Sequence, residues 1–312
     1  MRNNTIIIKF IIIFSVILTA LWGSTRVGST HQFLGPAGEP KIIAPNDAIN
    51  AYIPVVNNNA CITETIESPF SIEIAALHQI TTTVTSSGGQ GMSEEQFYAW
   101  YDQAFPTLLD ALKESGAGWT RIVIRWFDIE PTAPISGTPV YDSGWWQWYG
   151  DRFLKISQAG IKIIATIGTV PAWANPGIVC PPISVGYQPA FRRFLTDLVS
   201  RYDQPPYNIK HWEIFNESDN TTIGRASSHA CWGNYGSEYE QILSVSHSVI
   251  KAIDPGATVL LSGLAYDWFT EYPNGPFNRY FLDDIMTAGG AAYFDVLNFH
   301  YFPDFHAEVN RS

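Results

Sequence analysis

The sequence predicts an α/β protein, a TIM-type (β/α)8 barrel truncated after about strand six. Short apolar segments alternate with amphipathic ones, and the apolar segments begin about every 40 residues. Each apolar segment is a nearly continuous hydrophobic run, which is typical of parallel strands buried on both faces by crossover helices. No Gly-rich phosphate loop follows any of them, so a barrel is favoured over a doubly wound sheet.

The expected strands and helices alternate along the chain. The strands are expected at residues 71–77, 119–126, 161–168, 210–215, 258–263 and 294–299. The helices are expected at residues 94–115, 145–158, 190–202, 237–253 and 280–287, with glycines just past the ends of the first two. A complete barrel needs eight strands, so the predicted barrel is incomplete.

The first 66 residues are expected to lie outside the barrel. Residues 1–24 join a basic start to a short apolar run and then small residues, which is typical of a secretory signal peptide. The same pattern also fits an uncleaved N-terminal membrane anchor. Residues 25–66 are rich in Gly, Pro, Asn and Ser and are expected to form a surface leader, with the barrel in residues 67–312. Both interpretations of the first segment predict a secreted or otherwise extracytoplasmic protein.

The composition limits the function. The chain has 18 basic and 29 acidic residues, a net charge of −11, and no basic cluster, which argues against a nucleic-acid partner. With 46% hydrophobic and 15% charged residues the chain is globular. No GxGxxG fingerprint and no HExxH or paired-cysteine spacing is present, so neither a nucleotide cofactor nor a metal is expected.

Polar residues stand where the predicted strands end, and in such barrels catalytic side chains occupy those ends. Asn216 and Glu217 follow one strand, Arg125 lies near the end of another, and His300 and Tyr301 follow a third. A carboxyl group, an amide, a guanidinium and an imidazole together form a hydrogen-bonding pocket that suits a polyhydroxylated ligand. The sequence therefore points to sugars.

These residues carry a resemblance to a known group of enzymes. The Asn216 and Glu217 pair, Arg125, the Pro-Ala-Trp-Ala element at 171–174 and His300 resemble the retaining glycoside hydrolases of the largest barrel clan, clan A, and are similar to families 39 and 5. The resemblance implies that Glu217 is the general acid/base and that Asn216 holds the sugar 2-hydroxyl. It also implies that Arg125 orients a nucleophilic Glu at the end of a seventh strand.

The chemistry of glycoside cleavage fits these roles. One carboxyl group must be protonated to donate to the leaving oxygen, and a second, ionised carboxylate about 5 Å away must attack the anomeric carbon. Glu217 is expected to stay protonated through partial burial under Trp173 and through the charge of its partner. Two alternatives stay open: Glu217 in a core salt bridge, and Arg125 in a plain ion pair between strands.

The sequence departs from the clan pattern in three places. Ser218 stands where the clan often has Pro, and Phe302 stands where it usually has Tyr, with Tyr301 one position earlier. No Glu follows a seventh strand, and Glu308 and Asp304 are expected to be loop residues. The chain is therefore expected to be either a fragment of a longer hydrolase, which we favour, or a remnant that no longer catalyses, and to be inactive as given.

Two functions follow from this pattern. The first is a glycosidase, in fragment form, acting on a β-linked poly- or oligosaccharide. The second is a non-catalytic carbohydrate-binding barrel that uses the same cleft. A metal-dependent deacetylase on the same fold is a more remote option. The expected partner is a polysaccharide or oligosaccharide, with membrane contact only through an uncleaved first segment.

Tryptophans and cysteines add two expectations. Trp126, Trp173, Trp232 and Trp268 follow strand ends and are expected to stack on sugar rings, although ordinary packing is the alternative. Cys180 and Cys231 lie in neighbouring loops, so a disulfide between them is predicted for an exported chain, with Cys61 left over.

Overall fold

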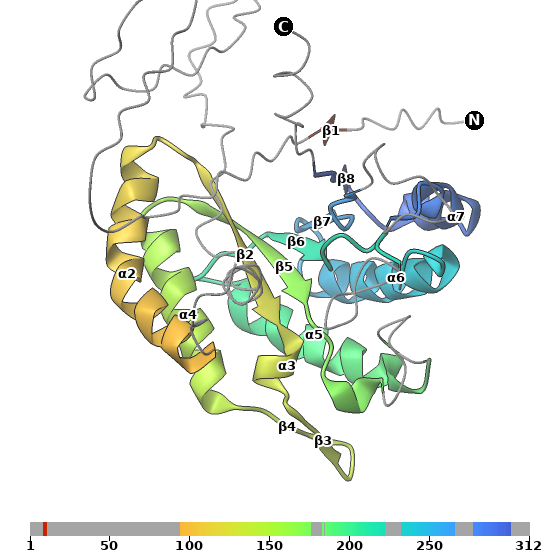
Figure 1. Cartoon of the computed structure of the whole chain (residues 1–312), viewed down its shortest axis with the longest axis horizontal. Coiled ribbons are helices and arrows are strands. Elements are labelled where there is room, and N and C mark those ends of the chain that lie inside the picture. The colour runs from red at the N-terminus through yellow and green to blue at the C-terminus, as the bar shows by residue number, and fades with distance from the viewer. Residues whose placement is uncertain are drawn as a thin grey trace, which may run out of the picture. The chain divides into compact units, whose positions relative to one another are not determined.

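A six-stranded sheet lies at the centre of the fold (Figure 1). This computed structural model describes residues 9–10, 94–175, 183, 185–221, 232–265 and 277–300. The strand order is β1-β8-β7-β6-β5-β2, and every neighbouring pair is parallel. The strands are β1 (Lys9–Phe10), β2 (Trp119–Arg125), β5 (Lys162–Gly168), β6 (His211–Ile214), β7 (Thr258–Leu260) and β8 (Val296–Leu297).

The parallel sheet confirms the predicted α/β fold class. Five of the six predicted strands appear in the expected order, and consecutive ones lie side by side from β2 to β8. The predicted strand at 71–77 lies outside the described residues. The sixth strand of the observed sheet is instead β1, two residues of the segment that was predicted to be an export signal, which pair with β8.

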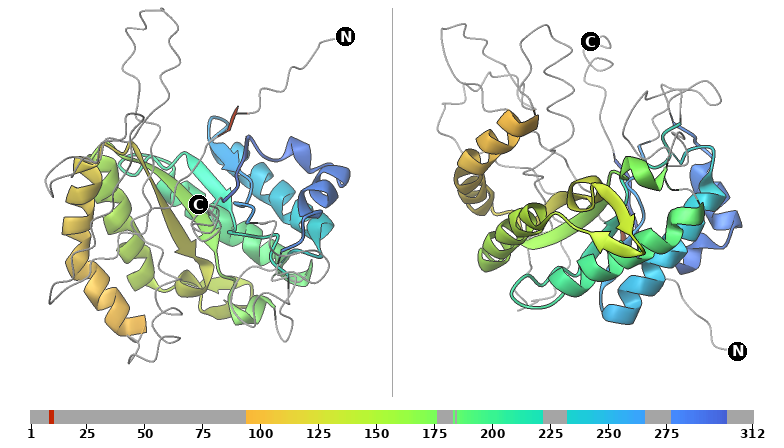
Figure 2. Two further views of the ribbon diagram at one scale, coloured as in Figure 1. Left: turned by 45° about the horizontal axis from the view of Figure 1, so that its top comes forward. Right: turned by 90° about the horizontal axis from the view of Figure 1, so that it is seen from below.

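Helices connect the strands and follow one another around one face of the sheet (Figure 2). They are α2 (Glu94–Glu114), α4 (Ser143–Gln158), α5 (Gln188–Tyr202), α6 (Gly236–Ile253) and α7 (Phe281–Thr287). All five lie within two residues of their predicted bounds. None of the described helices is long and apolar enough to cross a membrane.

The core between sheet and helices explains why the strands are continuous apolar runs. Six of the seven residues of β5 are buried, and the two faces of the strand have different neighbours. Ile163, Ala165 and Ile167 belong to the main hydrophobic core, while Ile164 packs with Leu260 and Val296. A parallel strand covered on both faces needs hydrophobic residues at every position.

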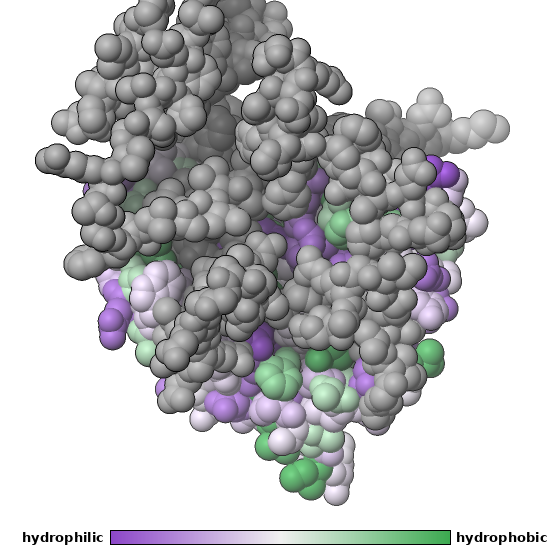
Figure 3. All heavy atoms as spheres, in the orientation of Figure 1, coloured by the Kyte–Doolittle hydropathy of each residue, from purple (hydrophilic) through white to green (hydrophobic). Residues whose placement is uncertain are grey.

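The segment after β2 contains structure that the sequence pattern did not predict. It forms the short helix α3 (Trp126–Ile129) and then the antiparallel hairpin of β3 (Thr132–Ile135) and β4 (Thr138–Val140). The hairpin projects from the edge of the sheet where β2 and β5 end (Figure 1). Its apolar side chains are on the surface, Ile135 being 70% exposed, and apolar residues gather at this part of the surface (Figure 3).

Candidate functional site

Glu217 follows β6 on a strained stretch of backbone. Phe215 and Glu217 have φ angles of 63° and 48°, in the left-handed region that non-glycine residues rarely adopt. The conformation is held from both sides, because the Phe215 amide donates to the Ile167 carbonyl and the Glu217 amide donates to the Gly263 carbonyl. Strain that the surroundings hold in place is common at active sites.

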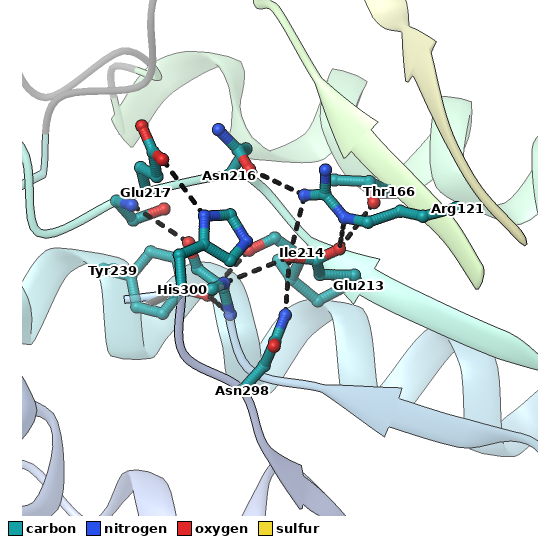
Figure 4. Close-up of polar contacts among 12 residues, drawn as sticks. Arg121, Thr166, Glu213, Ile214, Asn216, Glu217, Tyr239, Asn298 and His300 are labelled. Carbon is teal, nitrogen blue, oxygen red and sulfur yellow. Dashed lines mark hydrogen bonds and ion pairs between the residues drawn. The ribbon is translucent and has the colours of Figure 1, made fainter. Parts of the chain in front are cut away.

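The carboxyl group of Glu217 faces an imidazole. His300 Nδ1 lies 3.0 Å from Glu217 Oε1, and the two side chains are only 10% and 8% exposed (Figure 4). His300 fits there because residue 263 is glycine: a Cβ at Gly263 would lie 2.2 Å from His300 Nε2. The structure thus brings together Glu217 and His300, two of the predicted site residues that are 83 residues apart.

A second glutamate, Glu213, lies beneath this pair and is completely buried. The Arg121 guanidinium donates to both of its oxygens, Nε to Oε2 at 2.6 Å and Nη2 to Oε1 at 3.0 Å. The Thr166 hydroxyl donates at 2.5 Å, the Asn298 amide at 2.9 Å and the Gly263 backbone N–H at 3.0 Å. Glu213 therefore accepts five hydrogen bonds from β2, from β5 and from the residues that follow β7 and β8.

The charge state of Glu213 follows from these contacts. Burial by itself would raise the pKa of its carboxyl group, but the Arg121 guanidinium, His300 and the Thr166 hydroxyl outweigh that effect and hold the pKa below its usual range. Glu213 is thus an ionised partner of Arg121, and its lone pairs are occupied by protein donors. It is not an open catalytic carboxylate.

Arg121 links this buried cluster to Asn216. Its Nη2 donates to Asn216 Oδ1 at 2.6 Å. Since the amide oxygen accepts from Arg121, the amide nitrogen of the half-buried Asn216 points the other way, as Figure 4 shows. The site therefore presents a fixed donor, Asn216 Nδ2, next to the Glu217 carboxyl group.

Arg125, the arginine predicted to orient a nucleophilic Glu, has partners outside the Glu217 cluster among the contacts found here. Arg125 Nη1 donates to the Tyr98 hydroxyl at 2.6 Å, and Nη2 lies 3.4 Å from Asp128 Oδ1, so its guanidinium contacts α2 and α3. Arg121, four residues earlier on the same strand, contacts Asn216. Both have the same parity on β2, and the sequence does not say which of the two long side chains crosses β5 to reach β6.

The predicted aromatic platform is only partly present. Trp173 is half-buried, and its Nε1 donates to the Glu130 carbonyl at 2.9 Å. Trp126 and Trp232 were expected to face the ligand, but they are 0% and 1% exposed. Trp126 stacks on Phe194 with ring centres 5.3 Å apart. The prediction was wrong for these two because rings just past a strand end also seal the core beneath the loops.

Trp232 packs against Phe215 and Tyr239.

Four predicted residues lie outside the described part of the chain: Tyr301, Trp268, Cys180 and Cys231. The ligand and disulfide predictions for them stay predictions. Among the residues that the structure describes, no group of three or more His, Cys, Asp or Glu side chains is arranged to hold a metal ion.

Glu130, which the sequence analysis passed over, anchors this side of the site. Its buried carboxylate accepts from Trp126 Nε1 at 2.8 Å and from the Arg193 guanidinium. Burial raises the pKa of this carboxyl group, and the hydrogen bond from Trp126 and the charge of Arg193 only partly offset that rise. Through its carbonyl, Glu130 also fixes the indole of Trp173.

Comparisons with known proteins give distant structural matches. No family model and no curated protein matches the chain. A family 39 glycoside hydrolase from the gut symbiont Bacteroides cellulosilyticus is 19% identical over 64% of this chain and 36% of its own length, with a TM-score of 0.44. An exo-β-1,4-mannosidase from an Opitutaceae bacterium is 15% identical over 54% of this chain and 29% of its own, with a TM-score of 0.43.

A family 1 β-glucosidase from Thermotoga maritima is 14% identical over 54% of this chain and 39% of its own length, with a TM-score of 0.42. The chain is thus distantly similar in structure to glycosidases. It spans between 29% and 39% of the length of these three structures.

Proposed function

We propose that this chain carries the acid/base half of a retaining glycosidase site, with Glu217 as the general acid/base. The glycosidic oxygen of a β-linked poly- or oligosaccharide takes a proton from Glu217 as the bond to the anomeric carbon breaks. In the second step the same carboxylate removes a proton from the attacking water. Such a substrate is consistent with the export predicted for the chain.

The observation that carries the proposal is the setting of the Glu217 carboxyl group. It is nearly buried, stands on strained backbone at a strand end, and lies 3.0 Å from His300. Glu217 contacts an imidazole, a group that can take up and release protons, while the Arg121 guanidinium pairs with the fully buried Glu213. This distribution favours proton transfer at Glu217 and a purely structural role at Glu213.

Two neighbours are suited to bind the sugar. Asn216 offers its Nδ2 as a hydrogen-bond donor, and Arg121 holds the amide in that orientation. Trp173 presents a half-exposed ring next to the strand end, and sugar C–H faces stack on such rings. We assign Asn216 to a sugar hydroxyl, Trp173 to a ring face, and Arg121 to the positioning of Asn216.

The second carboxylate of the reaction is assigned outside the described residues. Glu213 is the other carboxylate of the cluster, and its two oxygens already accept five protein hydrogen bonds. We expect the chain alone to turn over glycosides slowly or not at all, and we expect an added anion such as formate to take the place of the attacking carboxylate in part.

The test uses the purified chain with aryl β-glycosides whose leaving groups differ in acidity, with and without sodium formate. We expect formate to increase the turnover. Glu217→Gln should reduce this turnover about 100-fold or more for a phenyl leaving group. The loss should be small for 2,4-dinitrophenyl, which leaves without a proton donor.

Glu114→Gln, an exposed glutamate on α2, is the matched control and should behave like the unchanged chain. An equal effect of Glu217→Gln on both leaving groups contradicts the acid role. Binding of oligosaccharides, measured by calorimetry, without any formate-dependent turnover also contradicts it and favours the carbohydrate-binding barrel.

A further inference from the structure

A groove lies beside α3, and Phe127 and Asp128 of that helix line it. It has a volume of about 670 Å³, within the range of small-ligand sites. Its walls come from the start of α2, from α3 and from the start of α4, which meet at the lower edge of the view in Figure 1. None of its lining residues belongs to the Glu217 cluster.

Aromatic rings form much of its lining. Tyr98, Trp145 and Trp148 contact one another edge to face, with ring centres between 4.6 and 5.6 Å apart. Phe127 on α3 adds a fourth ring, which is 40% exposed. Four rings around one groove provide apolar surface of the kind on which sugar C–H faces stack.

Three carboxylates also line the groove, and their partners indicate the charge of the ligand. Asp128 pairs with Arg125, and Asp102 pairs with Arg152. Asp142 caps α4 through Oδ1, which accepts from the Gly144 and Trp145 amides. Two of the three charges are thus balanced by arginines, and the third lies at the N-terminus of α4, where the helix dipole stabilises it. The groove therefore suits a neutral ligand rather than a cation, and the carboxylate oxygens suit hydroxyl donors.

The groove is close to the candidate site along the sheet. α3 follows β2 directly, and Glu130 at its end accepts the hydrogen bond from Trp173. β2 lies two strands from β6, which amounts to about 10 Å across the sheet. A ligand of several sugar units has the length to occupy both places, whereas a disaccharide occupies one.

We propose that this groove is a second carbohydrate-binding site, which holds a neutral stretch of a polysaccharide away from Glu217. The inference rests on the proposed function for the class of ligand. It goes beyond that function in predicting a polymer as the substrate, because the residues that line the groove lie outside the Glu217 cluster and only a ligand that extends past that cluster contacts them.

The test is gel electrophoresis of the full chain through matrices containing hydroxyethylcellulose, glucomannan or xylan. We expect at least one of these polymers to slow the chain. Phe127→Ala should lower the affinity for that polymer, obtained from the retardation at several polymer concentrations, by about fivefold or more. Phe127→Trp should restore the affinity. Binding of cellobiose, mannobiose or xylobiose, measured by calorimetry, should not change.

Trp100→Ala is the matched control, because Trp100 is 41% exposed and lies on the opposite side of α2 from Tyr98 and Asp102. The proposal that the groove binds a polysaccharide is wrong if Phe127→Ala and Trp100→Ala are retained equally, or if no polymer retains the chain. The Glu217 assay uses short aryl glycosides, so it decides the proposed function separately. If Phe127→Ala loses retention and the Glu217 assay is negative, the proposal of a carbohydrate-binding groove stands and the proposed glycosidase function is wrong.

Discussion

At the scale of single residues, the candidate site is supported by a buried ion pair. Arg121 and Glu213 are 4% and 0% exposed in their side chains. The pair orients a site residue, because Arg121 also donates a hydrogen bond to the Asn216 amide oxygen. Removing one member of a buried pair leaves the other charge without compensation, which is far more costly than losing a surface pair.

We therefore predict that Arg121→Met lowers the free energy of unfolding by about 3 to 5 kcal/mol in a urea titration. Lys155→Met, which breaks an ion pair with Asp151 whose partners are both 49% exposed, is the control and should cost about 1 kcal/mol or less. The double variant Arg121→Met with Glu213→Leu should recover part of the loss. Equal losses in Arg121→Met and Lys155→Met would show that the buried pair contributes no more than a surface pair.

At the scale of elements, α4 shows how the chain marks a helix start next to the groove. Asp142 precedes the helix with an extended backbone, and its Oδ1 accepts from the Gly144 and Trp145 amides at 2.8 and 3.2 Å. These amides have no partner inside the helix, so the side chain supplies one. The helix that begins here holds Trp145 and Trp148 in the groove wall.

We predict that Asp142→Ala lowers the free energy of unfolding by about 1 kcal/mol, while Asp142→Asn keeps most of the stability. The measurement is again urea unfolding, with Gln147→Ala, at an exposed position of the same helix, as the control. A loss in Asp142→Asn as large as in Asp142→Ala would mean that the charge, and not the cap, is responsible.

At the scale of the whole molecule, the carboxyl and amino ends of the parallel strands carry different kinds of contact. The ends of the strands carry the Glu217 cluster, and the beginnings carry structural contacts such as that of His211 with Trp119, whose ring centres are 4.6 Å apart. Burial, together with the charge of Lys162, lowers the pKa of His211 from 6.5 to about 4. The folded state thus holds this imidazole neutral.

This shift predicts a pH dependence of the global stability. The unfolded chain takes up a proton on His211 near pH 6.5 and the folded chain only near pH 4, so stability is complete above pH 6.5 and falls as the pH drops toward 4. The loss should reach about 2 to 3 kcal/mol. Urea unfolding between pH 7.5 and 4 should therefore show a smaller decline in His211→Gln than in the unchanged chain, and parallel declines would contradict the assignment.

Much of this architecture was readable from the sequence, because strands covered on both faces must be apolar throughout and because glycines and polar residues mark where helices end. The order of five strands and the bounds of five helices follow from that pattern. The hairpin and α3 do not, since short elements stabilised by tertiary contacts have no periodicity to detect.

The sequence by itself determined that Asn216 and Glu217 stand at the end of a buried strand and that His300 stands at the end of another. Only the tertiary structure decided that Arg121 reaches Asn216 while Arg125 contacts Tyr98 and Asp128. It also decided that Glu213 accepts five hydrogen bonds and that Trp126 and Trp232 are core residues. The physical reason is that strand parity fixes the side from which a side chain leaves the backbone. Where a long or bulky side chain ends is fixed by the charges and space that other elements bring to it.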